Sequence, residues 1–380
     1  MSVRGIFILA SFLKIRRVIG SRVLCFFGEN CIINHPFIIV TYRVEKRKGS
    51  PRGEVEELLM LLRRGGYPRP LYVLLDSGGF QLLTGKAEST PEGVVNSALL
   101  ISDALGGEGV VYMNLLDYPA SQVDMPRDEF ERRLEKTFEY YSRQLDYYYK
   151  GGRERENIRV MMPVHGGTPE RVEQFMRRVS PLIRDYGITG FAVTGITGFE
   201  VSGTSWFSYM LSRISSLSRG VLDSGSRIID FHFLGFFDKR LWLAGAFAQI
   251  PELRTVTADT AVFAEYARRH SFIISSIPSP VEVSLKEVGV IPCNCPICRV
   301  VRESGLEEKL IQGVKDYTFL LKLHNIYEYL RFAEVAFRLP KIGIEALGLN
   351  YDSLMEKVRM ALRGEIEERK GILKYLKTGK

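Results

Sequence analysis

The sequence predicts an α/β fold, a (β/α)8 barrel with a zinc-binding subdomain appended near its end. Short apolar, β-rich runs alternate with polar, helix-like stretches along most of the chain. The strand candidates are apolar on both faces, which indicates a parallel sheet covered by helices. About eight such units in roughly 240 residues fit a (β/α)8 barrel. A doubly wound open sheet is the alternative, but no G-x-G-x-x-G opens a helix after the first strand.

Each element is recognised by its periodicity and its ends. The stretch 54–66 has apolar residues spaced by three and four and ends at glycine, as a helix does. The stretch 91–107 begins with proline and ends with glycine. Two further helices are expected at 127–152 and 169–187. The predicted strands are 37–44, 71–76, 109–117, 158–167, 188–195, 227–236, 253–259 and 271–277.

The N-terminal segment is predicted to lie outside the barrel. Its apolar run is broken at Lys14, Arg16 and Arg17, short of the ~20 residues that a membrane span needs. No small-residue cleavage site follows it. We therefore expect an amphipathic or buried element and no membrane partner. The predicted division is an N-terminal extension (1–36), the barrel (37–280), the zinc-binding subdomain (281–340) and a C-terminal helical tail (341–380).

Composition and charge narrow the class of protein. Hydrophobic residues make up 46% of the chain and charged residues 25%, as in ordinary globular proteins. Three of the five cysteines lie in one cluster, which excludes the dispersed disulfide framework of a small secreted protein and favours a reducing, cytoplasmic setting. The net charge of +8 suits a polyanionic partner such as nucleic acid, although ordinary solvated lysines and arginines would give the same charge.

Polar or glycine residues are predicted at or near the carboxyl ends of five strands. Asp76 follows "LYVLL", Asp117 follows "VVYMNLL", His165 follows "VMMPV", Asp259 follows "RTVTA", and Gly190 lies in "ITGFAV". In a barrel these ends converge on one mouth, where active sites are built. The sequence therefore predicts that these residues belong to one site.

A second candidate site has the spacing C-x-C-x2-C-x25-H, formed by Cys293, Cys295, Cys298 and His324. Three thiolates and an imidazole are ligands that tetrahedral Zn²⁺ prefers. Four protein ligands leave no open position for water, so the predicted zinc is structural. A redox Cys-x-x-Cys pair and a set of buried, unligated cysteines are the alternatives.

The stretch "LLDSGGFQLLTGK" (74–86), taken with the zinc spacing, resembles the tRNA-guanine transglycosylase superfamily. These enzymes exchange a guanine base in RNA for a 7-deazaguanine derivative, on a (β/α)8 barrel with a zinc subdomain near its end. The resemblance covers roughly residues 37–335. It implies tRNA and a 7-deazaguanine base as partners, a structural zinc ion and a homodimer.

The resemblance also implies residue roles. Asp76 would be the general acid/base and Asp259 the nucleophile. Asp117 would read the base edge. The remaining base-binding residues would be Ser77, Phe80, His165, Gly166, Gly190 and Leu234, with Phe80 and Leu234 as the walls of a base sandwich and the Gly190 N–H on the base carbonyl. An ordinary turn or core residue is the alternative at each of these positions.

The chemistry agrees with these roles. Exchanging a base at a ribose carbon passes through an oxocarbenium-like state, in which one carboxylate traps the carbon and a second carboxyl protonates the leaving group. The target base must also leave its stack. Two departures from the family pattern stand out: His165 replaces the usual Gln before Gly-Gly, and Gly195 stands where a Glu is expected. Deazaguanine insertion into DNA and an inactive RNA-binding or partner paralogue are therefore the alternatives.

Overall fold

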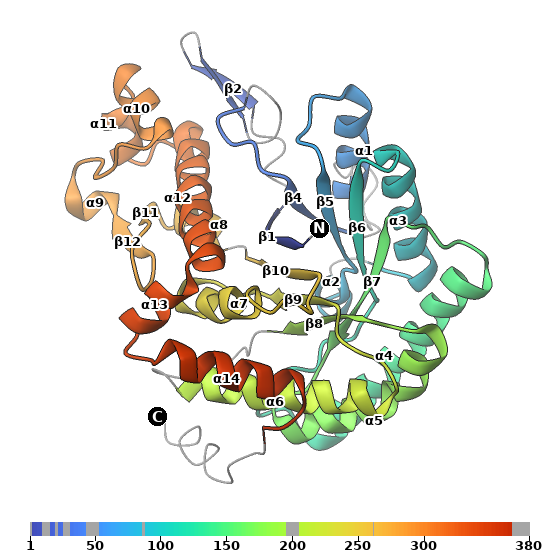
Figure 1. Cartoon of the computed structure of the whole chain (residues 1–380). Helices are drawn as coiled ribbons and strands as arrows, with labels where there is room; N and C mark the ends of the chain where they lie inside the picture. Colours follow the sequence, from blue (N-terminus) through green and yellow to red (C-terminus); the bar gives the residue numbers. More distant parts are fainter. Residues whose placement is uncertain are drawn as a thin grey trace.

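Eight parallel strands close into a barrel in the computed structural model (Figure 1), so the predicted fold is confirmed. The strands are connected in the spatial order β1-β10-β9-β8-β7-β6-β5-β4, and β1 pairs with β4 to close the ring. The structure describes residues 2–9, 16–19, 22–25, 31–42, 53–85, 88–194, 205–260 and 262–366. The barrel strands are β1 (Val3–Leu9), β4 (Phe37–Thr41), β5 (Leu71–Asp76), β6 (Gly109–Asn114), β7 (Ile158–Val164), β8 (Gly190–Thr194), β9 (Asp230–Leu234) and β10 (Thr255–Asp259).

Helices lie around the outside of the barrel. Two of them begin at a threonine cap followed by proline: the side chains of Thr90 and Thr168 accept the N–H groups of Gly93 and Arg171. The helices of the barrel are α1 (Glu54–Arg64), α2 (Gly79–Leu83), α3 (Pro91–Leu105), α4 (Arg127–Leu145), α5 (Pro169–Tyr186), α6 (Ser205–Asp223), α7 (Leu241–Phe247) and α8 (Val262–Arg268).

The barrel begins at residue 3 rather than at residue 37. β1 lies within the predicted N-terminal extension, yet Val3 pairs with Thr255 of β10 and Ile8 pairs with Ile38 of β4. The prediction of a separate extension is wrong for these residues. It failed because the next described elements after β1 are β2 (Arg16–Ile19) and β3 (Arg22–Cys25), which pair with each other, rather than the helix expected after a barrel strand.

The stretch 271–277, predicted to continue the strand series, contains a strand outside the barrel. β11 (Ser271–Ile274) pairs antiparallel with β12 (Val281–Ser284) in a separate two-stranded sheet. The long helix α12 (Thr318–Arg338) contacts β11, α7, α8 and β1. It therefore packs against β1 of the barrel. The remaining helices are α9 (Leu285–Val288), α10 (Pro296–Glu303), α11 (Glu307–Ile311), α13 (Pro340–Ala346) and α14 (Tyr351–Leu362).

Side chains alternate between the inside and the outside of the barrel, as the period of two requires. On β1, Ile6 and Ile8 pack among the helices, whereas Phe7 belongs to a separate inner cluster. That cluster is formed by Phe7, Phe37, Ile39, Leu74, Tyr112 and Met161. These apolar side chains fill the barrel interior. Polar functional groups are therefore expected at the mouth of the barrel.

Two further findings concern the N-terminal region and membranes. Cys25 and Cys31 form a disulfide, a pairing that the expectation of a reducing setting did not include. Among the described residues, no helix is both long and apolar enough to span a bilayer.

Candidate active site at the barrel mouth

Three aspartates occupy the carboxyl ends of their strands. Asp76 is the last residue of β5, Asp259 is the last residue of β10, and Asp117 lies three residues beyond the end of β6. Their charges act on one another, since Asp117 and Asp259 both raise the pKa of Asp76. The structure therefore brings together three carboxyl groups that the sequence placed on separate strands.

Asp76 has the most perturbed carboxyl group of the three. The residue keeps some exposed surface, but burial of its carboxyl, followed by the charges of Asp117 and Asp259, raises its pKa to about 7. Hydrogen bonds from the Gly78 N–H and the Thr41 side chain oppose this shift. A carboxyl group that titrates near neutrality can both donate and accept a proton at physiological pH.

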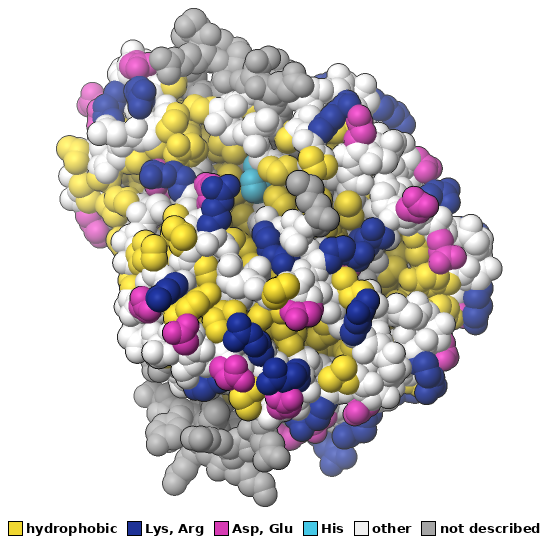
Figure 2. Space-filling view, viewed as in Figure 1, with side chains coloured by type: hydrophobic (Ala, Val, Ile, Leu, Met, Phe, Trp, Pro, Cys, Tyr) yellow, Lys and Arg dark blue, Asp and Glu magenta, His cyan; other side chains and the backbone are white. Residues whose placement is uncertain are grey.

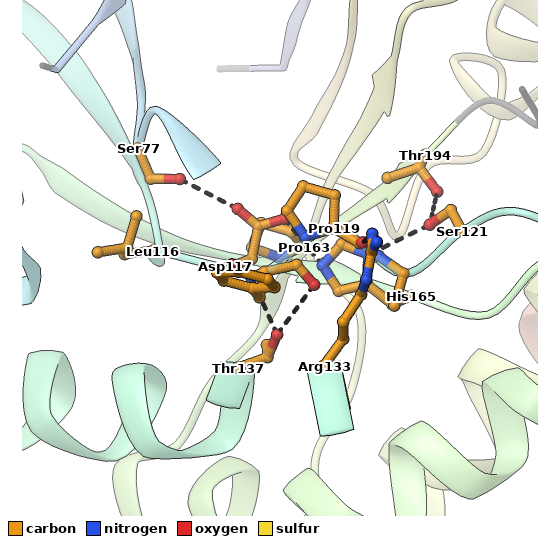
Figure 3. A network of polar contacts seen from close by, with 12 residues as sticks. Ser77, Leu116, Asp117, Pro119, Ser121, Arg133, Thr137, Pro163, His165 and Thr194 are labelled. Carbon is orange, nitrogen blue, oxygen red and sulfur yellow. Dashed lines mark hydrogen bonds and ion pairs between the residues drawn. The ribbon is translucent and has the colours of Figure 1, made fainter. Parts of the chain in front are cut away.

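Asp117 is held between Ser77 and His165 (Figure 3). The Ser77 hydroxyl donates to Asp117 Oδ1 at 3.2 Å, and His165 Nε2 lies 2.8 Å from Asp117 Oδ2. The Ala120 N–H donates to His165 Nδ1 at 3.3 Å, so Nδ1 is an acceptor and the proton of the ring lies on Nε2. That N–H is not aligned with Asp117 Oδ2, so among the described residues it has no well-directed acceptor. His165 thus presents a buried donor beside a carboxylate.

The two glycines of "DSGG" are required by close packing. Gly78 has φ +77°, a left-handed conformation that favours glycine. A Cβ on Gly79 would lie 2.4 Å from Asp117 Oδ1, so a larger residue there would displace the carboxylate. Glycine at these two positions allows the start of α2 to lie close to Asp117. This explains why two glycines follow Ser77 in the sequence.

The loop after β7 is fixed by buried polar contacts. Gly166 has φ +120°, and its N–H donates to the Ala120 carbonyl at 3.2 Å. The buried Arg213 of α6 donates to the carbonyls of Gly166 and Thr194, and burial lowers its pKa to about 10. The Thr194 hydroxyl donates to Ser121, whose hydroxyl lies 3.2 Å from His165 Nδ1. These contacts hold His165 in place, and the Gly166 N–H is already used by the Ala120 carbonyl of the loop after β6.

Asp259 is oriented by one group on β9 and one directly after it. The Gly235 N–H donates to Asp259 Oδ1 at 3.0 Å, and His232 Nε2 lies 3.1 Å from the same oxygen. His232 was missed by the sequence reasoning. It lies two residues before Leu234 on the same strand, and this alternation is the signal that could have placed both side chains on one face.

Three predicted base-binding positions have different outcomes. Leu234 is the last residue of β9 and is half-buried, so it does lie at the mouth. Gly190 is the first residue of β8, so its predicted place at the carboxyl end of a strand is wrong. A Cβ there would lie 2.3 Å from the Val160 carbonyl, which gives this glycine a packing role. Phe80 belongs to α2, but its side chain lies outside the described residues, as does Gly195.

The predicted metal ligands form one cluster, which is called the Cys3His cluster below. One ligand atom from each of Cys293, Cys295, Cys298 and His324 lies within 4.8 Å of the others. His324 Nδ1 is 3.3 Å from Cys295 Sγ and 3.2 Å from Cys298 Sγ, while Nε2 contacts the Ile273 carbonyl at 2.9 Å. A carbonyl only accepts, so Nε2 carries the proton and Nδ1 offers its lone pair. This donor set could hold a metal ion.

The chain is similar to a curated protein described as tRNA-guanine(15) transglycosylase from Sulfolobus acidocaldarius. The two sequences are 23% identical over 363 residues, which cover 90% of this chain and 63% of that protein. The chain thus spans less than two thirds of the length of this relative. No protein-family model matches the chain. The similarity supports a relation to the tRNA-guanine transglycosylase superfamily.

Proposed function

We propose that this protein is a base-exchange transglycosylase that replaces guanine in tRNA with a 7-deazaguanine derivative. The observation that carries the proposal is the meeting of Asp76, Asp117 and Asp259 at one barrel mouth in three different environments. Burial and neighbouring charge raise the pKa of Asp76 to about 7, while N–H donors orient Asp259. Carboxyl groups that differ in this way can serve as acid and nucleophile in one site.

In this proposal Asp259 attacks C1′ of the target nucleoside and forms an ester with the ribose as the bond to guanine breaks. The protonated Asp76 gives its proton to the departing guanine. The incoming base then attacks the same carbon and loses a proton to Asp76, so Asp259 is released and Asp76 is again protonated. The configuration at C1′ is retained because two displacements occur.

Base recognition is assigned to Asp117 and its partners. The carboxylate would accept N–H groups of the base edge, as the amino and ring N–H groups of guanine and of 7-deazaguanines require. The Ser77 hydroxyl donates to that carboxylate, and His165 Nε2 lies beside its other oxygen. Phe80 and Leu234 are proposed as the walls of the base sandwich. His165 supplies a hydrogen-bond donor as well. In this proposal its Nε2–H donates to an acceptor on the base.

The Cys3His cluster fits a structural zinc ion. Its four donors are three sulfurs and one imidazole nitrogen, the set that closed tetrahedral zinc sites use. Cys293, Cys295, Cys298 and His324 would hold the ion. When bound, zinc would tie the loop before α10 to α12, which packs on β1 of the barrel. The cluster supplies no group to the proposed reaction.

A nucleic acid as the large substrate agrees with the net charge of +8 and with the tRNA named in the description of the relative. The face in Figure 2 has lysines and arginines interspersed with acidic side chains rather than gathered in one continuous patch. We therefore base the choice of tRNA on the similarity and not on a basic surface.

The proposal is tested by incubating the protein with radiolabelled guanine and either bulk tRNA or duplex DNA. We expect label in tRNA, no label with the Asp259→Asn variant, and inhibition by a 7-deazaguanine base. Label in DNA alone would contradict tRNA as the substrate and would favour deazaguanine insertion into DNA. Label in neither polymer would contradict the activity and would favour an inactive paralogue.

A further inference from the structure

We propose that His232 is a positioning residue that selects which oxygen of Asp259 reacts with the ribose. This inference rests on the proposed function, because it assigns a task to a neighbour of the proposed nucleophile. His232 lies on β9, and its register partner on β10 is Thr257, two residues before Asp259. The imidazole therefore reaches Asp259 from the neighbouring strand.

The ring is enclosed by the barrel interior. His232 has no exposed surface, and its ring centroid lies 5.8 Å from that of Phe7 in an edge-to-face arrangement. Within the described part of the chain, its polar contacts are Nδ1 with Thr257 Oγ1 at 2.9 Å and Nε2 with Asp259 Oδ1 at 3.1 Å. Both ring nitrogens of this buried side chain are therefore used, one by a hydroxyl and one by the carboxylate.

The carboxylate determines where the proton of the ring lies. An ionised Asp259 can only accept hydrogen bonds, so Nε2 must carry a hydrogen and donate it to Oδ1. The Thr257 hydroxyl can then donate to Nδ1, which favours the tautomer with the hydrogen on Nε2. Thr257, His232 and Asp259 thus form a directed chain of hydrogen bonds across two adjacent strands.

Two donors converge on one oxygen of Asp259. Oδ1 accepts from both the Gly235 N–H and His232 Nε2, whereas Oδ2 has no hydrogen-bond partner in the part of the chain that is described. Oδ2 is therefore the oxygen left to bond to C1′. Holding a nucleophile in one orientation removes rotational freedom before the reaction, which lowers the barrier of the chemical step more than it improves binding.

The test measures the single-turnover rate of covalent adduct formation with tRNA, together with kcat, KM and thermal stability. His232→Phe keeps a ring of similar size but loses the donor. His232→Gln keeps an N–H that can reach Oδ1. We expect His232→Phe to slow adduct formation roughly 10- to 100-fold, the effect of losing one hydrogen bond to a charged group, with KM unchanged. His232→Gln should recover most of the rate.

A second pair of variants tests the same chain without changing the histidine. Thr257→Val removes the hydroxyl and should slow adduct formation, whereas Thr257→Ser keeps the hydroxyl and should not. Equal rates for these two variants would contradict the inference even if His232→Phe fails to fold.

The remaining outcomes separate this inference from the proposed function. If the wild type forms the adduct and His232→Phe forms it equally fast, only the role of His232 is overturned. If His232→Phe and His232→Gln lose equal amounts of rate and of thermal stability, the inference is overturned and His232 acts only in packing the core. A wild type that forms no adduct with tRNA or DNA overturns the proposed function and this role together.

Discussion

Two buried histidines, one at the barrel mouth and one in the Cys3His cluster, are held by opposite kinds of backbone group. His165 Nδ1 accepts the N–H of Ala120, so its other nitrogen carries a hydrogen and faces Asp117. His324 Nε2 contacts the carbonyl of Ile273, so its other nitrogen offers a lone pair to the thiols. The backbone partner thus decides whether the second nitrogen of an imidazole donates a hydrogen or offers a lone pair that could bind a metal ion.

The two sites also differ in how their residues are distributed along the chain. The three cysteines lie within six positions and meet a single histidine of α12. The aspartates of the mouth come from three strands and depend on the closure of the whole barrel. Damage to the Cys3His cluster should therefore act on folding, and damage to the mouth should act on the reaction.

The largest effect is expected from removing one of the proposed metal ligands. His324→Asn should lower the free energy of unfolding by several kcal/mol, because metal binding contributes on the order of 10 kcal/mol to folding in small zinc sites. The measurement is thermal unfolding together with the metal content of the purified protein. His270→Asn is the matched control: His270 lies near the same subdomain, contacts the Ile311 carbonyl, and is not part of the cluster. Equal losses in both variants would contradict a structural metal.

Asp76→Asn should lower base exchange by about 10²- to 10⁴-fold, since it removes the proposed acid and base. The same change should stabilise the fold above neutral pH. The pKa of Asp76 is raised from 3.8 to about 7, so the folded state loses stability relative to the unfolded state as pH rises from about 4 to 7. Asparagine does not titrate and escapes this loss.

Urea unfolding of wild type and Asp76→Asn at pH 5 and pH 8 tests the direction of this pH dependence of stability. The stability gained from the substitution should be larger at pH 8. A gain that is equal at both pH values would contradict a buried Asp76 carboxyl with a raised pKa.

The smallest effect is expected at His165. His165→Gln keeps an N–H donor beside Asp117 and should preserve base exchange. His165→Leu removes the donor and should weaken binding of the incoming base by about tenfold, the value of one hydrogen bond. Steady-state kinetics with varied base concentration measures this as a change in KM. If both variants bind the base equally, the Nε2–H of His165 makes no contact with it.

The sequence predicted most of the barrel because local patterns determined its elements. The run at 71–76 matches β5 at both ends, and the cysteine spacing alone identified the Cys3His cluster. β1 was missed because, among the described residues between β1 and β4, the paired strands β2 and β3 stand where a helix was expected. β1 belongs to the barrel because it pairs with β10 and β4. The residues of β1 alone do not reveal these pairings.

At the mouth, the aspartates were predictable because strand ends can be read from apolar runs. The error at Gly190 arose from carrying over a motif without knowing the register, since "GFAVT" begins β8 at that glycine. His232 could not be assigned from the sequence alone, because its contact with Asp259 depends on which strand lies beside β9. The sequence predicted individual strands but not the side-chain contacts between neighbouring strands.

The central claim is a covalent bond between Asp259 and the ribose of the substrate. Mass spectrometry of the protein incubated with tRNA in the absence of an incoming base tests it directly. After digestion with nuclease and trypsin, the added mass should lie on the peptide 255–268, which contains Asp259, and should be absent in Asp259→Asn. An adduct on another peptide, or base exchange that persists in Asp259→Asn, would contradict the account.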